Sequence, residues 1–416
     1  MNFYPQFNYY IIVSTEDHIE LVKGGIGTYL GLLFQYLKER LGNVRLIWIT
    51  ESPSSNFFVR KDGIHHIFYI PKNINGITNT IERTCTRIHK LLILNRKNKI
   101  VIEAPDWEGL LSNLFSKDLG ANTLKITRLH SVLALTKQNI SEFTDKEKAQ
   151  MQREYKQLKY SDLISAPTKY VYEFTNTLLK QSLTQIPHCI IPNFINTKFC
   201  NTKSITRETA CNNFNSILKN NIICSNNKNV FCIGSLEYRK GIDLIIKISE
   251  IILNQDENIH FYLIGHFAKD GDSLTLNTKY SIQDLKSIIP DNISSNLHIC
   301  GYIPYAQLKN LYNASDTFLF CYRHDNFPGA LIEACLSGKN VVYFKRGGCT
   351  EIMKNGNEDL GIGFDGDNEY EIVQNGAIAL QKSLDNLDKY SAVSIQNKYI
   401  TNDIILKMCD EYKIRR

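Results

Sequence analysis

The most informative stretch of the chain reads Tyr322-Arg-His-Asp-Asn-Phe-Pro-Gly-Ala-Leu-Ile-Glu-Ala-Cys-Leu-Ser-Gly338, and it runs directly into Lys339-Asn-Val-Val-Tyr-Phe344. The pattern predicts a strand that ends in a polar loop, a short helix that begins near Pro328 and ends at Gly338, and a second strand. Proline suits the first helical position because its missing N–H would have no partner there, and glycine suits the left-handed residue after a helix end. The stretch therefore indicates an α/β architecture.

Two acidic residues in this stretch suggest a ligand. Glu333 has apolar neighbours on both sides, so its carboxylate is expected to be partly buried and to need donors from the fold or from a ligand. Asp325 lies eight residues earlier, roughly two turns at about 3.6 residues each, so both acids can face one cleft. The N–H groups at the helix start, beside Gly329, favour an anion such as phosphate. The set predicts a pocket for a nucleotide that carries a sugar; the alternative is a satisfied core acid at Glu333 and a solvated Asp325.

Size and composition narrow the class of protein. The chain has 416 residues, of which 43% are hydrophobic and 22% charged, and this predicts a soluble globular protein of two domains. It contains no apolar run of about 18 residues, and the start Met1-Asn-Phe-Tyr-Pro-Gln-Phe7 lacks the features of a secretion signal, so we expect a cytoplasmic protein. A net charge of +6 gives no case for nucleic acid binding. The eleven cysteines form no Cys-x-x-Cys pair and read as reduced core residues, not as a zinc or disulfide framework.

Short apolar runs alternate with helical patterns along the chain, as in parallel sheets with crossover helices. They predict two doubly wound domains, over residues 1–193 and 194–394, with a tail from about residue 395 to 416 that packs back on the first domain. The expected strands are Tyr9–Val13, Val44–Ile49, His65–Ile70, Ile100–Glu103, Lys125–Leu129, Leu163–Ala166, Cys189–Ile191, Asn229–Ile233, His260–Ile264, Leu297–Gly301, Thr317–Cys321 and Val341–Phe344.

Polar residues at the expected strand ends are further candidates, because the carboxyl ends of parallel strands face the ligand crevice of such a sheet. In the first half they are Asp106, Trp107 and His130; in the second half, Arg239 and Lys240 precede a helix start and would suit a diphosphate. Each also has a purely structural interpretation: His130 as a structural histidine, and Arg239 and Lys240 as a solvated basic turn. The clustered glycines of residues 24–27 likewise either approach a ligand or form a helix-start turn.

Six motifs occur in order along nearly the whole chain. They are Gly24-Gly-Ile-Gly-Thr-Tyr29, Glu103-Ala-Pro-Asp-Trp107, Arg128-Leu-His130, Ile191-Pro-Asn193, Gly234-Ser-Leu-Glu-Tyr-Arg-Lys-Gly241 and Asp325-Asn-Phe-Pro-Gly-Ala-Leu-Ile-Glu333. This combination resembles a GT-B glycosyltransferase of the large retaining family 4, and the last motif is the most specific part of the resemblance.

The resemblance implies two facing Rossmann-like domains, the first holding mainly the acceptor and the second mainly a nucleotide sugar. It implies that Glu333 binds the ribose hydroxyls, Asp325 the sugar hydroxyls and Lys240 the diphosphate, while His130 lies near the reactive face of the sugar. The expected donor-binding residues are Gly25, Arg239, Lys240, Asp325, Pro328, Gly329, Ala330, Leu331 and Glu333. The expected catalytic residues are His130, Lys240 and Asp325, and the acceptor-side candidates are Asp106, Trp107 and Arg128.

The resemblance also implies the partners. These are a nucleoside diphosphate sugar as donor and a glycan or lipid-linked acceptor, in surface polysaccharide, lipopolysaccharide or glycolipid synthesis. No cofactor and no divalent metal are expected, so Asp270-Gly-Asp272 and Asp365-Gly-Asp367 read as surface turns.

Two residues depart from the family's pattern. The family usually has Arg where this chain has Ser235, so one phosphate contact is missing or Arg239 replaces it. The first acid of the last motif is Asp325 instead of the commoner Glu, which leaves the identity of the donor sugar open.

A basic stretch from Arg83 to Lys99, with Ile88, Leu91, Leu92 and Leu94 interleaved, would suit peripheral contact with anionic lipid at the inner face of a membrane. The alternative is an ordinary crossover helix with a solvated basic face. For the whole chain, the alternatives to a transferase are a non-catalytic nucleotide-sugar-binding protein, for which Ser235 is the hint, and another GT-B enzyme such as a nucleotide-sugar epimerase or a hydrolase.

Overall fold

The structure is a computed structural model, and it divides the chain into two compact units. Unit 1 comprises Met1–Phe194 and Tyr399–Arg416, and unit 2 comprises Ile195–Lys398. The structure describes residues 6–16, 24–52, 54–71, 76–133, 143–195, 205–220, 222–267, 280–304, 307–308, 312–355, 358–386, 399 and 401–413. The Asp270–Asp272 turn lies outside these residues.

Unit 1 is built on an eight-stranded sheet with the order β3-β4-β2-β1-β5-β6-β7-β8. Its pairs are parallel except for the antiparallel pair β3–β4, and Ile11 at the centre faces Ile47 on one side and Ile102 on the other. The strands are β1 (Tyr9–Val13), β2 (Arg45–Glu51), β3 (Phe58–Asp62), β4 (His65–Ile70), β5 (Ile100–Pro105), β6 (Thr123–Arg128), β7 (Leu163–Ala166) and β8 (His188–Ile190).

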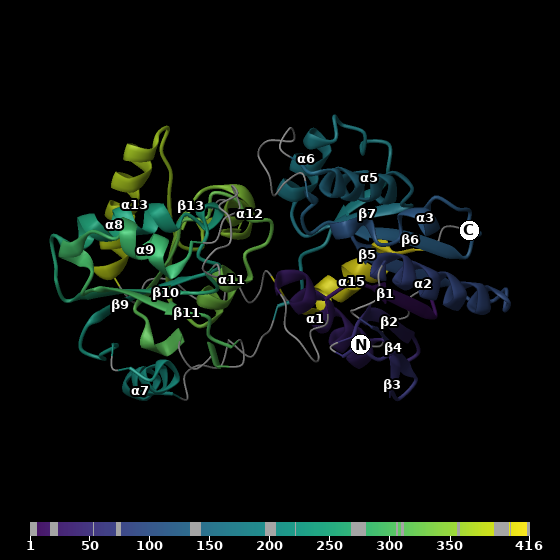
Figure 1. The fold of residues 1–416 in the computed structure, drawn as a ribbon, viewed down its shortest axis with the longest axis horizontal. Coiled ribbons are helices and arrows are strands. Elements are labelled where there is room, and N and C mark those ends of the chain that lie inside the picture. Colours follow the sequence, from purple (N-terminus) through teal and green to yellow (C-terminus); the bar gives the residue numbers. More distant parts are fainter. Residues whose placement is uncertain are drawn as a thin grey trace. The chain divides into compact units, whose positions relative to one another are not determined.

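Helices cover both faces of this sheet. One apolar core joins the strands to α1 (Gly24–Arg40) and to the last helix, α15 (Thr401–Glu411), which Figure 1 shows in yellow beside α1. A second core joins the other face to α2 (Ile77–Ile93) and α3 (Ser112–Phe115). The remaining elements are the 3₁₀ helix η1 (Trp107–Gly109), α5 (Asp145–Lys159) and α6 (Lys169–Leu178).

Unit 2 contains a six-stranded parallel sheet with the order β11-β10-β9-β12-β13-β16. The strands are β9 (Lys228–Ile233), β10 (Ile259–Ile264), β11 (Leu297–Gly301), β12 (Thr317–Phe320), β13 (Asn340–Phe344) and β16 (Ile362–Phe364), with a small hairpin of β14 (Lys354–Asn355) and β15 (Glu358–Asp359). The helices are α7 (Arg207–Leu218), α8 (Ile242–Leu253), α9 (Ile282–Ile288), α11 (Gly329–Leu336), α12 (Gly347–Ile352) and α13 (Glu369–Leu384), with the 3₁₀ helices η4 (Tyr238–Lys240), η5 (Asp291–Ile293) and η6 (Tyr312–Ala314).

The predicted α/β class, with two Rossmann-like sheets and a C-terminal helix returning to the first domain, is confirmed. Every expected strand is present, with ends that move by a residue or two. The sequence patterns did not predict β3, β16 or the two-residue strands β14 and β15. Phe58–Asp62 ends in three charged residues and is largely exposed, and Ile362–Phe364 is short and carries a glycine.

The helix α11 begins near Pro328, as predicted, but the proline is not its first residue. Pro328 precedes the helix as its N-cap with a non-helical ψ of 91°, and the helix begins at Gly329. Gly338 has a φ of +74°, as expected for the left-handed residue after the helix.

Candidate functional site

A cationic and an anionic side chain meet at the carboxyl ends of β9 and β12 in unit 2. The Nζ of Lys240, from η4 after β9, contacts Oδ2 of Asp325, from the loop after β12, and lies 3.8 Å from the centre of the Tyr322 ring. Oδ1 of Asp325 accepts from the N–H of Phe327 at 3.0 Å. Burial by itself would raise the pKa of Asp325, but the charges of Lys240 and Arg239 and the two hydrogen bonds outweigh it and lower that pKa below its usual value. The Asp325 carboxylate is therefore ionised at neutral pH.

Tight packing fixes the backbone that carries Lys240. Gly241 has a φ of +69°, and a Cβ there would lie 2.0 Å from the carbonyl oxygen of Cys321, so only glycine lets η4 approach the end of β12. Arg323 also connects the segment after β12 to η4 and α8. Its backbone N–H donates to the Arg239 carbonyl at 3.0 Å, and its guanidinium donates to the two carboxylate oxygens of Asp243 at 2.7 and 2.6 Å. These contacts hold η4 and the segment after β12 against each other.

Arg239 is more heavily engaged than Lys240. Its Nη2 donates to Oε1 of Glu237 at 2.5 Å, its Nη1 donates to the His324 carbonyl at 3.0 Å, and the Nη1 lies 3.9 Å from Oδ2 of Asp325. Ser235 is half-buried on the same loop. Arg239 therefore lies beside the acid, and its charge is shared between Glu237 and Asp325.

The start of α11, a few residues after Asp325 in the chain, has backbone N–H groups that can donate to a ligand. Pro328 has no side-chain cap for the helix, Gly329 is exposed with open space where a Cβ would stand, and Ala330 is half-buried. The first N–H groups of a helix have no intrahelical partners, and the dipole makes that end attractive to anions. Leu331, by contrast, is fully buried and belongs to the packing of the helix.

The preceding loop is held against α12. A Cβ on Gly348 would lie 2.4 Å from the carbonyl oxygen of Asn326, and the N–H of Gly348 donates to the Asp325 carbonyl at 2.7 Å. Deeper in α11, Glu333 is 8% exposed and its Oε2 accepts from the hydroxyl of Tyr312 at 3.2 Å. Unit 2 thus gathers the expected residues Arg239, Lys240, Asp325, Gly329 and Glu333 on neighbouring segments.

In unit 1, His130 follows β6 and is half-buried. Its ring lies 5.1 Å from the ring of Tyr29, and burial together with the charge of Arg128 lowers the pKa of His130 to about 3. The imidazole is neutral at physiological pH, so it can accept or donate a hydrogen bond without carrying charge.

Asp106 and Arg128 are both fully buried in unit 1. Oδ1 of Asp106 accepts from the N–H groups of Trp107 and His130, both at 2.9 Å, and of Ser131 at 3.3 Å, and burial raises the pKa of Asp106 to about 7. Asp106 is fully buried, and its hydrogen bonds hold the backbone of His130 and Ser131 in place. Trp107 is half-buried in η1.

Arg128 is likewise held by contacts within unit 1. It is fully buried and donates at 2.6 Å to Oγ of Ser165, to the Ile191 carbonyl and to Oδ1 of Asn193, while its guanidinium lies 4.8 Å from the centre of the Tyr29 ring. The strand-end rule identifies the edge of the sheet but does not tell which side chains point inward.

Sequence reasoning also missed a buried network around Glu103. The carboxylate accepts from three tyrosine hydroxyls: Tyr10 at 2.5 Å, Tyr29 at 2.9 Å and Tyr412 at 3.2 Å. Glu103 is fully buried, and Tyr412 comes from the segment that ends α15. The only signal in the sequence was a carboxylate inside an apolar strand.

The glycines at the start of α1 lie next to another acid. Gly25 is exposed and has open space where a Cβ would stand, while the N–H of Gly27 donates to Oε2 of Glu16 at 2.6 Å. A carboxylate thus occupies one of the donors at the start of α1.

Metal ligands do not cluster in the part of the chain that the structure describes, where no group of three or more His, Cys, Asp or Glu side chains is arranged to hold an ion. Asp365 pairs instead with Arg346 at 2.9 Å. Nor does any helix among the described residues combine the length and apolar character of a membrane span.

Comparisons with known proteins concern the fold and part of the sequence. Residues 214–391, which lie in unit 2 and hold the Lys240–Asp325 pair and α11, match the family profile described as "Glycosyl transferases group 1". The chain thus shares the sequence pattern of this family over those residues. It has the GT-B fold, since 97% of it superposes on 98% of sucrose-phosphate synthase from Thermosynechococcus elongatus with a TM-score of 0.71 and 16% sequence identity.

Two curated proteins show the sequence likeness. The phosphatidylinositol N-acetylglucosaminyltransferase gpi3 subunit of Schizosaccharomyces pombe is 23% identical over 190 residues, which are 43% of this chain and 38% of that protein. Mannosylfructose-phosphate synthase of Agrobacterium fabrum is 24% identical over 186 residues, 42% of this chain and 38% of that protein. The match spans about two-fifths of the length of each relative.

Proposed function

We propose that the chain is a retaining glycosyltransferase that moves a sugar from a nucleoside diphosphate sugar to an acceptor hydroxyl. The observation that carries the proposal is the Lys240–Asp325 pair, which lies on neighbouring segments with the exposed start of α11 and the buried Glu333. A cation, backbone donors and two carboxylates are the groups that a diphosphate, a ribose and a sugar need. The family match in this unit supports the same function.

The residues of unit 2 divide the work on the donor. Lys240 and the first N–H groups of α11 stabilise the diphosphate as it departs, because negative charge grows there in the transition state. Asp325 accepts from sugar hydroxyls, and Glu333 accepts from the ribose hydroxyls. Arg239 stands beside Asp325 and compensates for Ser235 with its positive charge.

In this proposal, no side chain of the protein forms a covalent bond to the sugar during the reaction. The bond between the anomeric carbon and the diphosphate oxygen breaks, and the acceptor oxygen bonds to the same face of that carbon. The leaving phosphate takes the acceptor proton, so the products are a glycoside with retained configuration and a nucleoside diphosphate. Neutral His130 binds the sugar near its reactive face, and Trp107 contacts the acceptor.

A turnover experiment tests the proposal. UDP-, GDP- and ADP-sugars are incubated with glycan and lipid-linked acceptors in EDTA, and NMR follows the products. We expect a new glycosidic signal with retained anomeric configuration, and its loss in Glu333→Ala. Free sugar or an epimerised donor without an acceptor would favour a hydrolase or an epimerase, and donor binding without any turnover would favour a non-catalytic binder.

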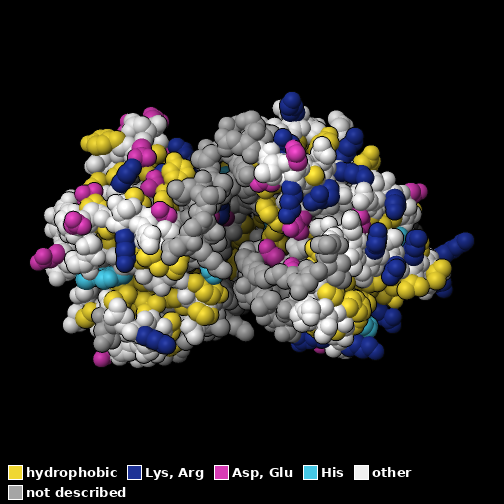
Figure 2. Space-filling view, in the orientation of Figure 1, with side chains coloured by type: hydrophobic (Ala, Val, Ile, Leu, Met, Phe, Trp, Pro, Cys, Tyr) yellow, Lys and Arg dark blue, Asp and Glu magenta, His cyan; other side chains and the backbone are white. Residues whose placement is uncertain are grey.

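For the acceptor, a surface on α2 supports a membrane-linked pathway such as surface polysaccharide, lipopolysaccharide or glycolipid synthesis. A depression of about 430 Å³ is lined by Arg83, Arg87, Lys90 and Lys117, and within the described residues none of these cations forms an ion pair. Leu91 and Leu94, on and just after α2, are 67% and 79% exposed. Figure 2 shows Lys and Arg side chains in dark blue over unit 1. Cations beside exposed leucines suit an anionic lipid surface at the inner face of a membrane.

Vesicle flotation tests this surface. We expect the wild-type chain to float with vesicles that contain anionic lipid, and the double change Arg87→Glu with Lys90→Glu to abolish flotation. The same reversal at Arg60 and Lys61, on exposed strand β3, is the matched control and should leave flotation unchanged. Flotation that ignores the anionic lipid content would overturn the membrane contact.

A further inference from the structure

Glu333 has a protein donor that the sequence motif does not contain. The hydroxyl of Tyr312 donates to Oε2 of Glu333 at 3.2 Å, across 21 positions of sequence. Tyr312 is fully buried and its ring lies 5.0 Å from the ring of Phe318 on β12. A carboxylate offers about four acceptor positions, so a fixed donor on one oxygen determines where the others point.

The short helix that carries Tyr312 is held by its backbone carbonyls. Oγ of Ser315 donates to the Tyr312 carbonyl at 2.8 Å, and Nδ2 of Asn229 donates to the Ala314 carbonyl at 2.9 Å. Asn229, the second residue of β9, also forms two hydrogen bonds with Asp316. The N–H of Asp316 donates to the Asn229 carbonyl at 2.8 Å, and the N–H of Asn229 donates to Oδ2 of Asp316 at 2.7 Å. η6 is therefore tied to the central strand of the sheet.

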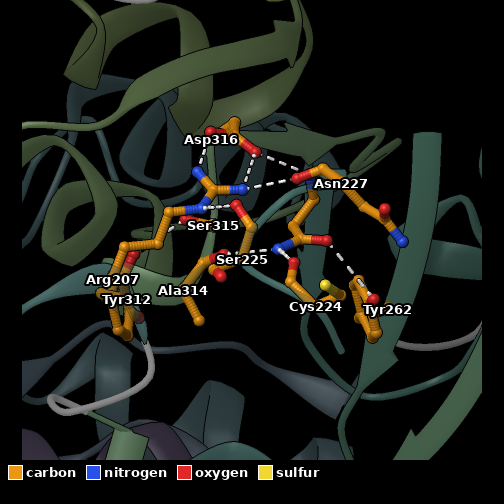
Figure 3. A network of polar contacts seen from close by, with 10 residues as sticks. Arg207, Cys224, Ser225, Asn227, Tyr262, Tyr312, Ala314, Ser315 and Asp316 are labelled. Carbon is orange, nitrogen blue, oxygen red and sulfur yellow. Dashed lines mark hydrogen bonds and ion pairs between the residues drawn. The ribbon is translucent and has the colours of Figure 1, made fainter. Parts of the chain in front are cut away.

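Arg207 completes this network, which Figure 3 shows. Its two terminal nitrogens contact the two oxygens of Asp316, with Nη2 at 2.6 Å from Oδ2. Nε donates to the Ser225 carbonyl at 2.9 Å and Nη2 to the Asn227 carbonyl at 2.6 Å. Two-pronged pairs of this kind fix direction as well as distance. The first residue of α7 thus fixes the segment that begins at Tyr312.

We infer that Tyr312 is a positioning residue for the ribose-binding carboxylate of Glu333, and that the Arg207–Asp316 pair holds Tyr312 in register. The inference rests on the proposed function, in which Glu333 accepts from the 2′ and 3′ hydroxyls of the ribose. Tyr312 binds the carboxylate from within the protein and orients its remaining acceptor positions toward the nucleotide. Without the phenol, the carboxylate loses this donor, and the geometry of the two ribose bonds is less well defined.

The test compares two ligands on two proteins. Calorimetry first identifies which of UDP, GDP and ADP binds the wild-type chain, and then measures that nucleotide against its 2′,3′-dideoxy form. We expect the wild type to prefer the ribonucleotide by about 100-fold, and Tyr312→Phe to reduce the preference to about tenfold, because buried polar groups discriminate strongly for the hydroxyls they bind. The loss should fall on the ribonucleotide alone, since the dideoxy form has no hydroxyls to misplace.

Controls separate positioning from a general loss of structure. Tyr343→Phe removes a different buried phenol of unit 2, which bonds to Oδ1 of Asp359 at 3.3 Å, and it should leave the preference unchanged. Arg207→Lys breaks the two-pronged pair and should lower the preference by a smaller factor than Tyr312→Phe. An equal loss for both nucleotides in Tyr312→Phe, or an unchanged preference, would overturn the inference.

Failure of the inference can be told from failure of the proposed function. Glu333→Gln should remove the preference for the ribonucleotide almost entirely. If Glu333→Gln left the preference intact, or if none of the three nucleotides bound, the proposed function would fall and the inference with it. If Glu333→Gln removed it and Tyr312→Phe did not, only the positioning role would be lost.

Discussion

Glu103 in unit 1 and Asp325 in unit 2 are both acids that are removed from water, yet their partners differ in kind. Glu103 is fully buried and accepts from the hydroxyls of Tyr10, Tyr29 and Tyr412, all neutral groups of its own core. The side chain of Asp325 keeps 13% of its surface exposed and is paired with a lysine at the end of the sheet. A buried acid whose hydrogen-bond donors are all neutral hydroxyls of the protein stabilises the core. A partly exposed carboxylate in a charged pair still has acceptor positions for a ligand. The predictions below test this difference.

The largest expected effect is on catalysis in unit 2. Lys240→Ala removes the cation that faces the departing diphosphate and should lower kcat by about 10²–10³-fold. Lys247→Ala is the control, because Lys247 forms a half-exposed pair with Glu369 and should leave kcat within about twofold. A steady-state rate for Lys240→Ala within threefold of the wild type would place the diphosphate elsewhere.

Stability should respond most strongly in unit 1. Glu103→Ala removes the acceptor of the Tyr10 and Tyr29 hydroxyls, leaves Tyr412 its contact with Ser165, and removes a charge that raises the pKa of Arg128, so we expect a loss of about 3–5 kcal/mol. Urea unfolding followed by circular dichroism measures it. Glu39→Ala, at an exposed position on α1, should change the free energy of unfolding by less than about 0.5 kcal/mol. Equal urea midpoints for the two variants would contradict the structural role of Glu103.

A smaller effect is expected from crowding the loop that carries Asp325. Gly348→Ala places a Cβ 2.4 Å from the Asn326 carbonyl, so the loop must shift, and the KM for the donor should rise about tenfold. Gly42→Ala meets nothing within 4 Å and serves as the control. Initial-rate kinetics over a range of donor concentrations decide the matter, and an unchanged KM for Gly348→Ala would show that the loop position is unimportant for donor binding.

The smallest effect concerns the pH dependence of unit 1. The native pKa of Asp106 is about 7 and its unfolded value is near 3.8, so the folded state binds the extra proton between these values. Its stabilising contribution is complete below about pH 4 and is lost as pH rises through 7. Asp106→Asn should therefore gain stability relative to the wild type as pH rises over this range.

Melting temperatures of both proteins between pH 4 and 8 measure this difference. His130 has the opposite trend, because its pKa of about 3 makes stability rise with pH up to about 6.5. Both proteins contain His130, so its contribution cancels when their melting temperatures are subtracted. Parallel melting curves would mean that Asp106 does not titrate in this range.

Part of the fold and of the candidate site could be predicted from the sequence. The strands and the Lys240–Asp325 region followed from local patterns, because apolar runs bounded by polar strand ends are visible residue by residue. Tyr312 and Tyr412 did not, because their partners Glu333 and Glu103 lie 21 and 309 positions away and only the fold brings them together. The burial of Arg128 was likewise hidden, since the strand-end rule gives the edge of the sheet but not the direction of a side chain.

The central claim is that unit 2 binds a nucleoside diphosphate sugar through Lys240 and Glu333. Thermal unfolding in EDTA with UDP-, GDP- and ADP-sugars tests it most directly, because a ligand that binds only the folded state raises the melting temperature. We predict that at least one of these donors stabilises the wild-type chain and that Lys240→Ala and Glu333→Ala both abolish the shift. A shift that persists in both variants, or no shift with any of the donors, would contradict the account.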